Sequence, residues 1–195
     1  MFDDTVRGSA AAAGVPAPSG MTVWLTGLPS AGKSTIARGV AERLRARGRR
    51  VEVLDGDELR RGLTRDLGFS RADRTENVRR IGFVARLLSR NGVTVLVPVI
   101  APYATSRLDV RSHHAEDGIA FAEVYVATPL GVCADRDVKG LYAEQRAGRL
   151  TGLTGIDDPY EPPVSPELAL PAHTQSVAES VEALHAFVTA RLAAA

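Results

Sequence analysis

The sequence predicts an α/β fold, an open, doubly wound parallel sheet of about five strands with helices on both faces. Apolar segments of strand length alternate with longer segments of helical periodicity, a pattern typical of parallel strands joined by helical crossovers. A glycine-rich segment separates the first strand from the first helix, and carboxylates follow the second strand. In such sheets ligands bind where the strands end.

The alternation of the two patterns defines each expected element. The expected strands cover residues 22–26, 51–54, 93–99, 123–126 and 168–170. The expected helices cover residues 33–47, 71–91, about 106–116 and 176–192. Gly48 and Gly92 are expected just after the ends of two helices, because glycine adopts the left-handed conformation that commonly follows a helix.

Two segments stand apart from this alternation. Residues 1–20 are rich in Ala, Gly, Pro and Ser, a composition that packs poorly, and we expect a flexible tail there. The remaining residues, 21–195, are expected to form a single domain. Within it, residues 140–163 contain four glycines and three prolines. A connection of this length is more often a mobile lid than a spacer, so we expect a lid segment at about residues 139–163.

Composition narrows the function classes. The net charge of +1 and the 5% aromatic content give little sign of a nucleic-acid surface. Cys133 is the single cysteine, so no intramolecular disulfide is expected, and a packing role is favoured for it. The sequence has no stretch of about 18 apolar residues and no signal-peptide pattern. We expect a cytoplasmic protein that binds neither nucleic acid nor membrane.

Residues 27–34, GLPSAGKS, match the motif G-x-x-x-x-G-K-[ST] between a predicted strand and a predicted helix, the context that the motif requires. We call this segment the phosphate loop. Its backbone N–H groups are expected to surround nucleotide phosphates at a helix N-terminus. Lys33 is expected to reach the β- and γ-phosphates, and Ser34 to bind Mg²⁺. The fold class is therefore P-loop NTPase-like, with a chance match as the alternative.

Lysine usage supports this interpretation. Of 24 Lys and Arg residues, only Lys33 and Lys139 are lysines. An exposed position that needs only a cation accepts either residue, so a lysine here indicates a site that requires a compact ammonium group. Lys139 is therefore a candidate second site, with chance as the alternative.

The second predicted strand runs into Asp55 and Asp57. In a doubly wound sheet these carboxylates lie beside the phosphate loop. One can hold Mg²⁺ or its water while the other accepts a proton from an acceptor hydroxyl, as phosphoryl transfer requires. The alternative is an ordinary capped turn.

Over most of residues 21–192 the sequence resembles the adenylylsulfate kinases, which phosphorylate the 3′-hydroxyl of adenosine 5′-phosphosulfate (adenylyl sulfate) with ATP. Six segments in the family's order carry the resemblance. They are the phosphate loop and residues 54–57 (LDGD), 66–70 (DLGFS), 73–81 (DRTENVRRI), 136–142 (RDVKGLY) and 152–161 (GLTGIDDPYE). The resemblance implies 3′-phosphoadenylyl sulfate and ADP as products, Mg²⁺ with ATP as co-substrate, and a homodimer. A separate ATP sulfurylase is a further partner that it suggests.

The resemblance also implies site residues. Those expected to bind ATP are Gly27, Leu28, Pro29, Ser30, Ala31, Gly32, Lys33, Ser34, Thr35 and Arg136. Those expected to bind the acceptor are Asp57, Arg60, Phe69, Arg74, Asn77, Ile100, Ala101, Lys139, Gly152 and Leu153. Asp57 is the expected group that orients and deprotonates the 3′-hydroxyl, Lys33 and Lys139 are expected to assist catalysis, and Asp55 is expected to work through magnesium or water.

The chemistry of the acceptor residues agrees with these roles. Arg60 and Arg74 offer planar paired donors for sulfate and phosphate, Asn77 offers hydrogen bonds, and the ring of Phe69 offers a face on which adenine can stack. Taken separately, Arg74 and Arg79 could be solvated charges on a helix, and Phe69 could be a core residue.

The sequence departs from the family's pattern at three places. Ala101 stands where many members have a serine that has been proposed as a phosphorylated intermediate. Because alanine has no hydroxyl, we expect direct, in-line transfer from ATP to the acceptor. Pro29-Ser30 replaces the usual Ser-Gly of the loop, and Glu58 replaces a common Asn. The added charge of Glu58 keeps open a P-loop kinase of another small nucleotide-like or hydroxyl metabolite, and a non-catalytic nucleotide sensor is a third alternative.

Overall fold

The computed structural model describes residues 20–194, and the N-terminal tail expected at residues 1–20 lies, except for Gly20, outside the described residues. Five parallel strands form one sheet in the order β2-β3-β1-β4-β5. The strands are β1 (Met21–Thr26), β2 (Val51–Val53), β3 (Thr94–Pro98), β4 (Ala120–Val126) and β5 (Leu168–Leu170). This confirms the predicted fold class.

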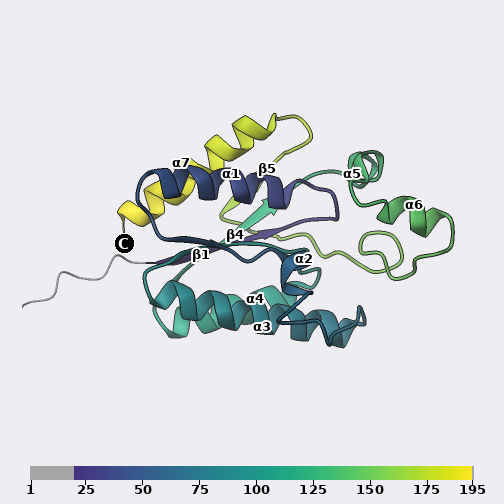
Figure 1. Cartoon of the computed structure of the whole chain (residues 1–195), viewed down its shortest axis with the longest axis horizontal. Coiled ribbons are helices and arrows are strands. Elements are labelled where there is room, and N and C mark those ends of the chain that lie inside the picture. The colour runs from purple at the N-terminus through teal and green to yellow at the C-terminus, as the bar shows by residue number, and fades with distance from the viewer. Residues whose placement is uncertain (1–19, 195) are drawn as a thin grey trace, which may run out of the picture.

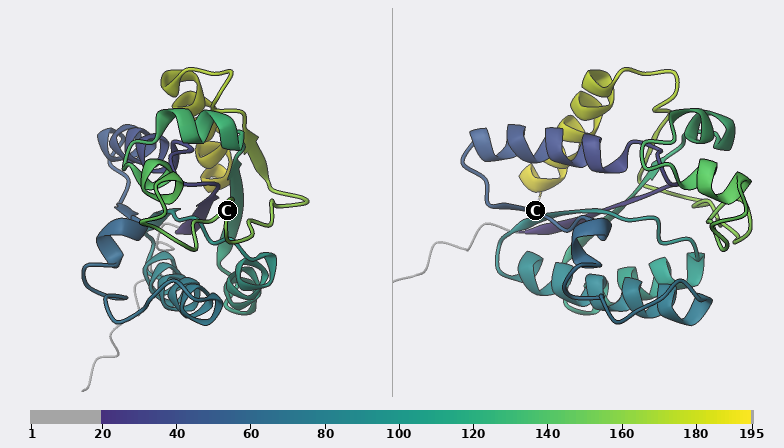
Figure 2. Two further views of the ribbon diagram at one scale, coloured as in Figure 1. Left: turned by 90° about the vertical axis from the view of Figure 1, so that its right-hand side faces the viewer. Right: turned by 45° about the vertical axis from the view of Figure 1, so that its right-hand side comes forward.

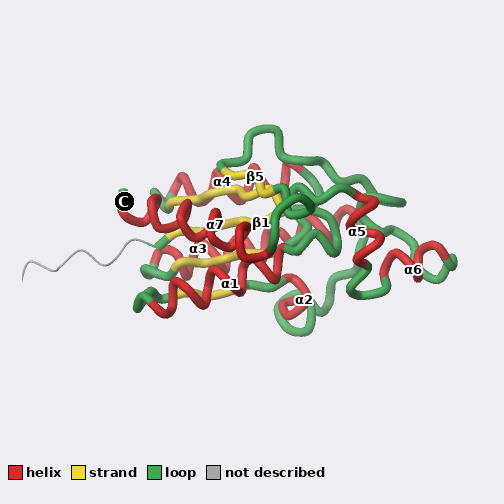
Figure 3. Tube along the Cα trace, turned by 90° about the horizontal axis from the view of Figure 1, so that it is seen from above, coloured by secondary structure: helices red, strands yellow, loops and turns green. Residues whose placement is uncertain are grey.

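The helices form a layer on each face of the sheet (Figure 1, Figure 2). One layer contains α1 (Lys33–Ala46) and α7 (Val177–Ala193), and the other contains α3 (Arg71–Arg90) and α4 (Ala104–Glu116). Three short helices lie outside the layers, toward the ends of the strands: α2 (Gly56–Leu59), α5 (Leu130–Arg136) and α6 (Leu141–Arg146). The view onto the face of the sheet in Figure 3 shows α5 and α6 beyond the ends of the strands.

The central position of β1 follows from its composition. Every residue of its sequence, MTVWLT, is buried, as expected of a strand covered by helices on both faces. Its side chains alternate between two cores. Val23 and Leu25 pack under α1 and α7, whereas Trp24 packs with Val78 and Ile81 of α3.

Local sequence explains where the long helices begin and end. The Ser70 side chain accepts a hydrogen bond from Asp73 N at the start of α3, and Ser176 and Glu179 form a capping box at the start of α7. Such caps satisfy N–H groups that have no partner within the helix. Gly92 follows α3 with φ +78°, so the predicted end of that helix is confirmed.

Sequence periodicity did not predict the three short helices α2, α5 and α6. A segment of four to seven residues contains too few turns to show a helical period.

The short helix α6 lies within the lid segment (residues 139–163), which was expected to stand apart from the core. Tyr142 and Leu153 of this segment are instead buried, and they belong to the core cluster that also contains residues of α1 and α7. The mobility of the lid segment stays a prediction.

None of the helices in residues 20–194 is both long enough and apolar enough to span a membrane.

Candidate active site

The candidate active site lies where the parallel strands end. The phosphate loop follows β1, α2 follows β2, and residues 99–103 follow β3. The lid segment lies beyond the same edge, on the right of Figure 1. Segments far apart in the sequence therefore meet at the edge where α/β sheets bind their ligands.

The backbone of the phosphate loop adopts conformations that favour glycine. Gly27 has φ +154° and Gly32 has φ +105°, and a Cβ atom on Gly27 would lie 2.7 Å from the carbonyl oxygen of Val126. Ser30 also has a positive φ, of +61°. No side chain caps the N-terminus of α1, and its first turn contains no acidic residue. Its free N–H groups can therefore receive an anion.

Lys33, the first residue of α1, is buried at the centre of the phosphate loop. Its Nζ donates hydrogen bonds to the carbonyl oxygens of Gly27 at 2.8 Å and Leu28 at 2.7 Å. Burial lowers the pKa of Lys33 to about 8, and the positive charge of Lys139 also lowers it. A buried ammonium group this close to a helix N-terminus is suited to a phosphate oxygen.

Ser34 and Asp55 offer the oxygen atoms expected for magnesium. Asp55 is 4% exposed. Its Oδ1 accepts a hydrogen bond from Asp57 N at 3.0 Å and its Oδ2 accepts one from Arg38 at 3.2 Å. Residues 20–194 contain no group of three or more His, Cys, Asp or Glu side chains that could hold a metal ion. A hydroxyl and a carboxylate nevertheless fit Mg²⁺, which commonly takes one or two protein ligands together with substrate phosphates and water.

Asp57 and Lys139, both predicted catalytic residues, form an ion pair. Asp57 lies in the first turn of α2, and Lys139 lies at the start of the lid segment. Their side chains are 58% and 53% exposed, so solvent screens the pair and it contributes little to stability. The contact links the lid segment to the residue expected to receive the acceptor proton.

Phe69 lies on the surface, where its ring is 59% exposed. The alternative of a core residue is therefore wrong. The guanidinium carbon of Arg60 lies 4.3 Å from the ring centroid and that of Arg74 lies 5.4 Å from it. Each arginine is close enough for a cation–π interaction, and the ring lies where a planar ligand can reach it.

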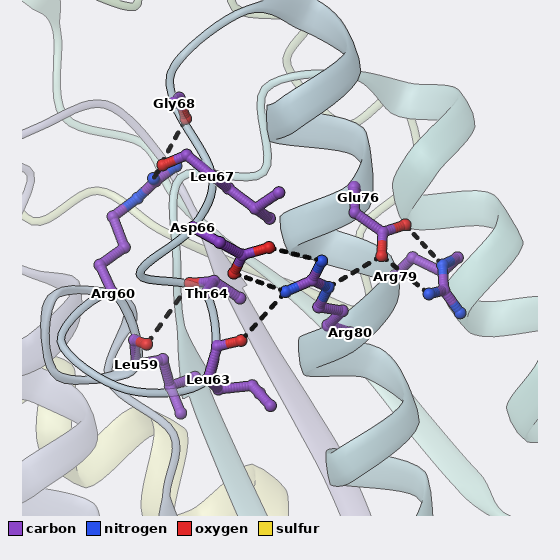
Figure 4. A network of polar contacts seen from close by, with 10 residues as sticks. All are labelled: Leu59, Arg60, Leu63, Thr64, Asp66, Leu67, Gly68, Glu76, Arg79 and Arg80. Atoms are coloured by element: carbon purple, nitrogen blue, oxygen red, sulfur yellow. Dashed lines mark hydrogen bonds and ion pairs between the residues drawn. The ribbon is translucent and has the colours of Figure 1, made fainter.

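Arg60 and Arg80 hold the loop that presents Phe69. Arg60 Nη1 donates to the carbonyl oxygens of Leu67 at 3.2 Å and Gly68 at 3.1 Å (Figure 4). Arg80 forms a two-pronged pair with Asp66 and also contacts Glu76 and the Leu63 carbonyl. Burial, together with the charge of Arg74, lowers the pKa of Arg60. The loop is therefore held by Arg60 at the end of α2 and by Arg80 of α3. Arg60 has a positioning role that the sequence did not indicate.

Arg74 joins α3 to the lid segment. It is 7% exposed, which excludes the alternative of a solvated charge. Its Nε donates to the Phe69 carbonyl at 2.9 Å, and its Nη2 donates to the Gly152 carbonyl at 2.7 Å and contacts Asp158 at 3.1 Å. The predicted acceptor residues Arg74, Phe69 and Gly152 are therefore brought together. Arg79, in contrast, is a solvated charge paired with Glu76.

The remaining acceptor residues lie in three places. The Oδ1 atom of Asn77 is buried and has no hydrogen-bond partner within the described residues, so it is available to accept a hydrogen bond. Ile100 and Ala101 follow β3, and Ala101 is 4% exposed with φ +43°. Leu153 is 6% exposed, so its side chain packs in the core rather than at the surface.

Side chains of α5 and α6 contact the backbone of the phosphate loop. Tyr142 donates a hydrogen bond from its hydroxyl to the Pro29 carbonyl at 3.1 Å. Arg136 donates to the Ala172 carbonyl at 2.7 Å and lies 3.5 Å from the Ala31 carbonyl, so it lies beside the loop, and its role in ATP binding stays a prediction. The sequence reading gave Tyr142 no role. Nor did it identify Arg38, Arg107 or Asp158, because none of these side chains carries a pattern of its own.

The fold and the site define a nucleotide-binding α/β enzyme of the P-loop kinase class. The sequence model of the adenylylsulphate kinase family matches residues 19–171. The chain belongs to this family.

Individual relatives agree with the family assignment. An adenylyl-sulfate kinase of Synechococcus sp. (strain JA-3-3Ab) is 55% identical over 163 residues, which cover 84% of this chain and 90% of that protein. The structure of the Mycobacterium tuberculosis APS kinase CysC in complex with AMPPNP and APS is 49% identical, with a TM-score of 0.85. The match covers 88% of this chain and 99% of that one.

A hexameric APS kinase from Thiobacillus denitrificans is 38% identical, with a TM-score of 0.65. The match covers 86% of this chain and 28% of that chain.

Proposed function

We propose that this protein transfers the γ-phosphate of ATP to the 3′-hydroxyl of adenylyl sulfate, giving 3′-phosphoadenylyl sulfate and ADP in sulfate activation. The observation that carries the proposal is the likeness to the M. tuberculosis enzyme in complex with AMPPNP and APS, which extends over 99% of that chain. The arrangement of residues described above supports it, because a phosphate loop, a carboxylate and an aromatic face share one edge of the sheet.

On the donor side, we assign ATP to the phosphate loop, Thr35 and Arg136. Lys33 is placed to neutralise charge on the β- and γ-phosphates as the bond to the leaving group breaks. Ser34 and Asp55 would hold Mg²⁺, with Asp55 acting directly or through water. When bound, the ion would supply positive charge against the charge that develops on the phosphates.

On the acceptor side, we assign Asp57 the role of orienting the 3′-hydroxyl and accepting its proton. Phe69 would stack on adenine, and Arg60, Arg74 and Asn77 would bind the phosphosulfate and the nucleoside. Ile100, Ala101, Gly152 and Leu153 would complete the wall of the site. Lys139, now paired with Asp57, would move to the transferred phosphate when the acceptor arrives, which frees the carboxylate to act as a base.

Transfer is expected to be direct and in line. Ala101 occupies the position of the serine that has been proposed as a phosphorylated intermediate in the family, and it offers no hydroxyl. The chain therefore has no covalent intermediate at this position. Closure of the lid segment (residues 139–163) would exclude water, which otherwise competes with the acceptor.

The test measures ADP release from Mg-ATP with a panel of acceptors: adenylyl sulfate, AMP and plain sugars. We expect rapid release with adenylyl sulfate alone. Release with another acceptor and none with adenylyl sulfate would contradict the proposal and favour a kinase of a different metabolite, the alternative that Glu58 keeps open. Binding of ATP without turnover on any acceptor would favour a nucleotide sensor.

The role of Asp57 predicts the effect of its removal. Asp57→Ala is expected to lower kcat by at least about 10²-fold, the scale of a lost general base, while ATP binding measured by calorimetry survives. Asp109→Ala, at an exposed carboxylate on α4, is the matched control and is expected to behave like the wild type. Substantial turnover by Asp57→Ala would remove Asp57 from this role.

The assembly of the protein belongs to the same proposal. We expect a homodimer built from a single domain of residues 21–195, and we expect a separate ATP sulfurylase as the partner that supplies adenylyl sulfate. Light scattering after size-exclusion chromatography tests the first expectation, since a monomer or a hexamer would contradict it. Co-purification with a sulfurylase of the same cell tests the second.

A further inference from the structure

Arg107, on the inner face of α4, is a buried cation that the assignments above do not use. It is 3% exposed. Its Nε pairs with Glu123 of β4 at 2.6 Å, its Nη1 donates to the Ala101 carbonyl at 2.8 Å, and its Nη2 donates to the Glu161 carbonyl at 2.8 Å. One guanidinium group therefore joins the end of β3, the end of the lid segment and the sheet.

The two backbone segments that Arg107 contacts are also joined to each other. Glu161 N donates to the Pro102 carbonyl at 2.9 Å, and the Glu161 carboxylate accepts a hydrogen bond from Ala104 N at 2.7 Å. Residues 100–102, which we call the acceptor turn, therefore form a continuous unit with the C-terminal part of the lid segment. Glu123 supplies the countercharge that allows Arg107 to remain buried at the centre of this unit.

A further bridge connects the acceptor turn to the phosphate loop. Thr26, the residue before Gly27, donates from its Oγ1 to the Ile100 carbonyl at 2.5 Å, and the Tyr160 hydroxyl lies 3.0 Å from the same Oγ1. Burial raises the pKa of Tyr160, so this hydroxyl keeps its proton. The spacing between the donor and acceptor sides therefore depends on the segment that Arg107 holds.

The acceptor turn has a conformation that needs such support. Ala101 has φ +43°, in the left-handed region that an alanine rarely adopts, and such residues persist where the surroundings over-determine them. Its carbonyl accepts a hydrogen bond from Arg107 Nη1, and its neighbour Ile100 is held by Thr26. These contacts select the conformation of the turn.

We propose that Arg107 is a positioning residue for phosphoryl transfer, which sets the acceptor turn at a defined distance from the phosphate loop and anchors the C-terminal end of the lid segment. The proposal rests on the proposed function, which assigns Ile100 and Ala101 to the acceptor site. Lid motion is then confined to residues before Tyr160. A small displacement of one reactant lowers the rate by a large factor. The kinetic parameters for the acceptor, and not those for ATP, therefore depend on Arg107.

The test uses Arg107→Lys, which retains a charge beside Glu123 but cannot span three acceptors in one plane. We expect kcat/KM for adenylyl sulfate to fall about 10- to 100-fold, while KM for ATP changes less than about threefold. Arg111→Met is the matched control for the charge around Glu123, because Arg111 lies one turn later on α4. It pairs with Glu167 and lies 3.8 Å from Glu123, but it has no hydrogen bond to the acceptor turn. It is expected to leave both parameters near wild type.

A second measurement does not depend on activity. Hydrogen exchange of the full chain is expected to be faster in Arg107→Lys at residues 100–104 and 160–161, and unchanged there in Arg111→Met. Equal loss of the ATP and acceptor parameters in Arg107→Lys, loss of neither, or unchanged exchange at both segments would overturn the proposal. If the wild type does not phosphorylate adenylyl sulfate, the proposed function fails, and the exchange measurement still decides the role of Arg107.

Discussion

Lys33 illustrates how burial adjusts a single residue to its task. The residue is 8% exposed, and its ammonium group donates to two carbonyl oxygens of its own loop. Burial lowers its pKa to about 8, because removing a charge from water favours the neutral form. The phosphates of ATP need the charged form, so the pKa of this group limits the pH range of binding.

The first prediction concerns this pH dependence. Below pH 8 Lys33 carries its proton, and above about 8 it loses that proton in the free protein. We therefore expect kcat/KM for ATP to decline on the alkaline side with a midpoint near pH 8. Initial rates with varied ATP and saturating acceptor, between pH 6.5 and 9.5, measure this decline. A flat profile up to pH 9.5 would show that Lys33 remains charged in the free protein.

Ala101 carries the second prediction. It is buried with φ +43°, and serine has about the same tolerance of that conformation as alanine. If transfer is direct, the added hydroxyl supplies no step of the reaction. We expect Ala101→Ser to change kcat by less than about tenfold, whereas a general acid–base group is worth 10²-fold or more. A gain well above tenfold, or a phosphoserine detected by mass spectrometry, would contradict direct transfer.

At the scale of elements, α6 is a short helix that contacts the phosphate loop through Tyr142. Its six residues are too few for independent stability. Tyr142 is 2% exposed and donates to the Pro29 carbonyl at 3.1 Å, while Gly155, later in the lid segment, lies against Leu28. The lid segment therefore contacts the phosphate loop at two residues, Leu28 and Pro29.

Tyr142→Phe is the third prediction. It removes the hydroxyl and leaves the buried Pro29 carbonyl without this partner, so we expect the free energy of unfolding to fall by about 1–3 kcal/mol and KM for ATP to rise. Urea unfolding followed by circular dichroism measures the first effect. Tyr125→Phe is the control, since the Tyr125 hydroxyl has no hydrogen-bond partner within residues 20–194. Equal free energies of unfolding for the two variants would show that the hydrogen bond to Pro29 does not stabilise the fold.

At the scale of the whole molecule, the two helices within each layer pack through close contacts at a glycine. A Cβ atom on Gly82 of α3 would lie 2.6 Å from Val110 Cγ2 of α4, and one on Gly39 of α1 would lie 2.8 Å from Val181 Cγ2 of α7. Each layer therefore packs at a distance that a glycine sets. Because α4 carries Arg107, the packing of α3 against α4 also bears on the acceptor turn.

Gly82→Val is the fourth prediction. Overpacking at this contact is expected to lower the free energy of unfolding by about 1–3 kcal/mol, and Val110→Ala in the same chain is expected to recover part of the loss. Thermal unfolding measures both variants. Gly131→Val is the control, because a Cβ atom on Gly131 meets nothing within 4 Å. A loss as large at Gly131 as at Gly82 would mean that helix propensity, and not packing, sets the effect.

The sequence by itself determined the features that depend on neighbours along the chain. Hydrophobic alternation marked all five strands and the four long helices to within a few residues, since periodicity is a local property. The phosphate loop could be read in the same way, because its motif, strand and helix are contiguous. The short helices α2, α5 and α6 could not be predicted in this way, because they contain too few turns to show a period.

Only the tertiary structure decided how distant residues meet. Lys139 pairs with Asp57 from 82 positions away, Arg74 reaches Gly152 across 78, and Arg107 reaches Glu161 across 54. The family resemblance named several of these residues but not their contacts with one another, and it named neither Arg107 nor Asp158 as a site residue. The physical reason is that a long side chain which bonds to a distant backbone carbonyl leaves no periodicity in the sequence. The partner of such a side chain depends on the order of strands in the sheet and on the packing of helices on the two faces of the sheet.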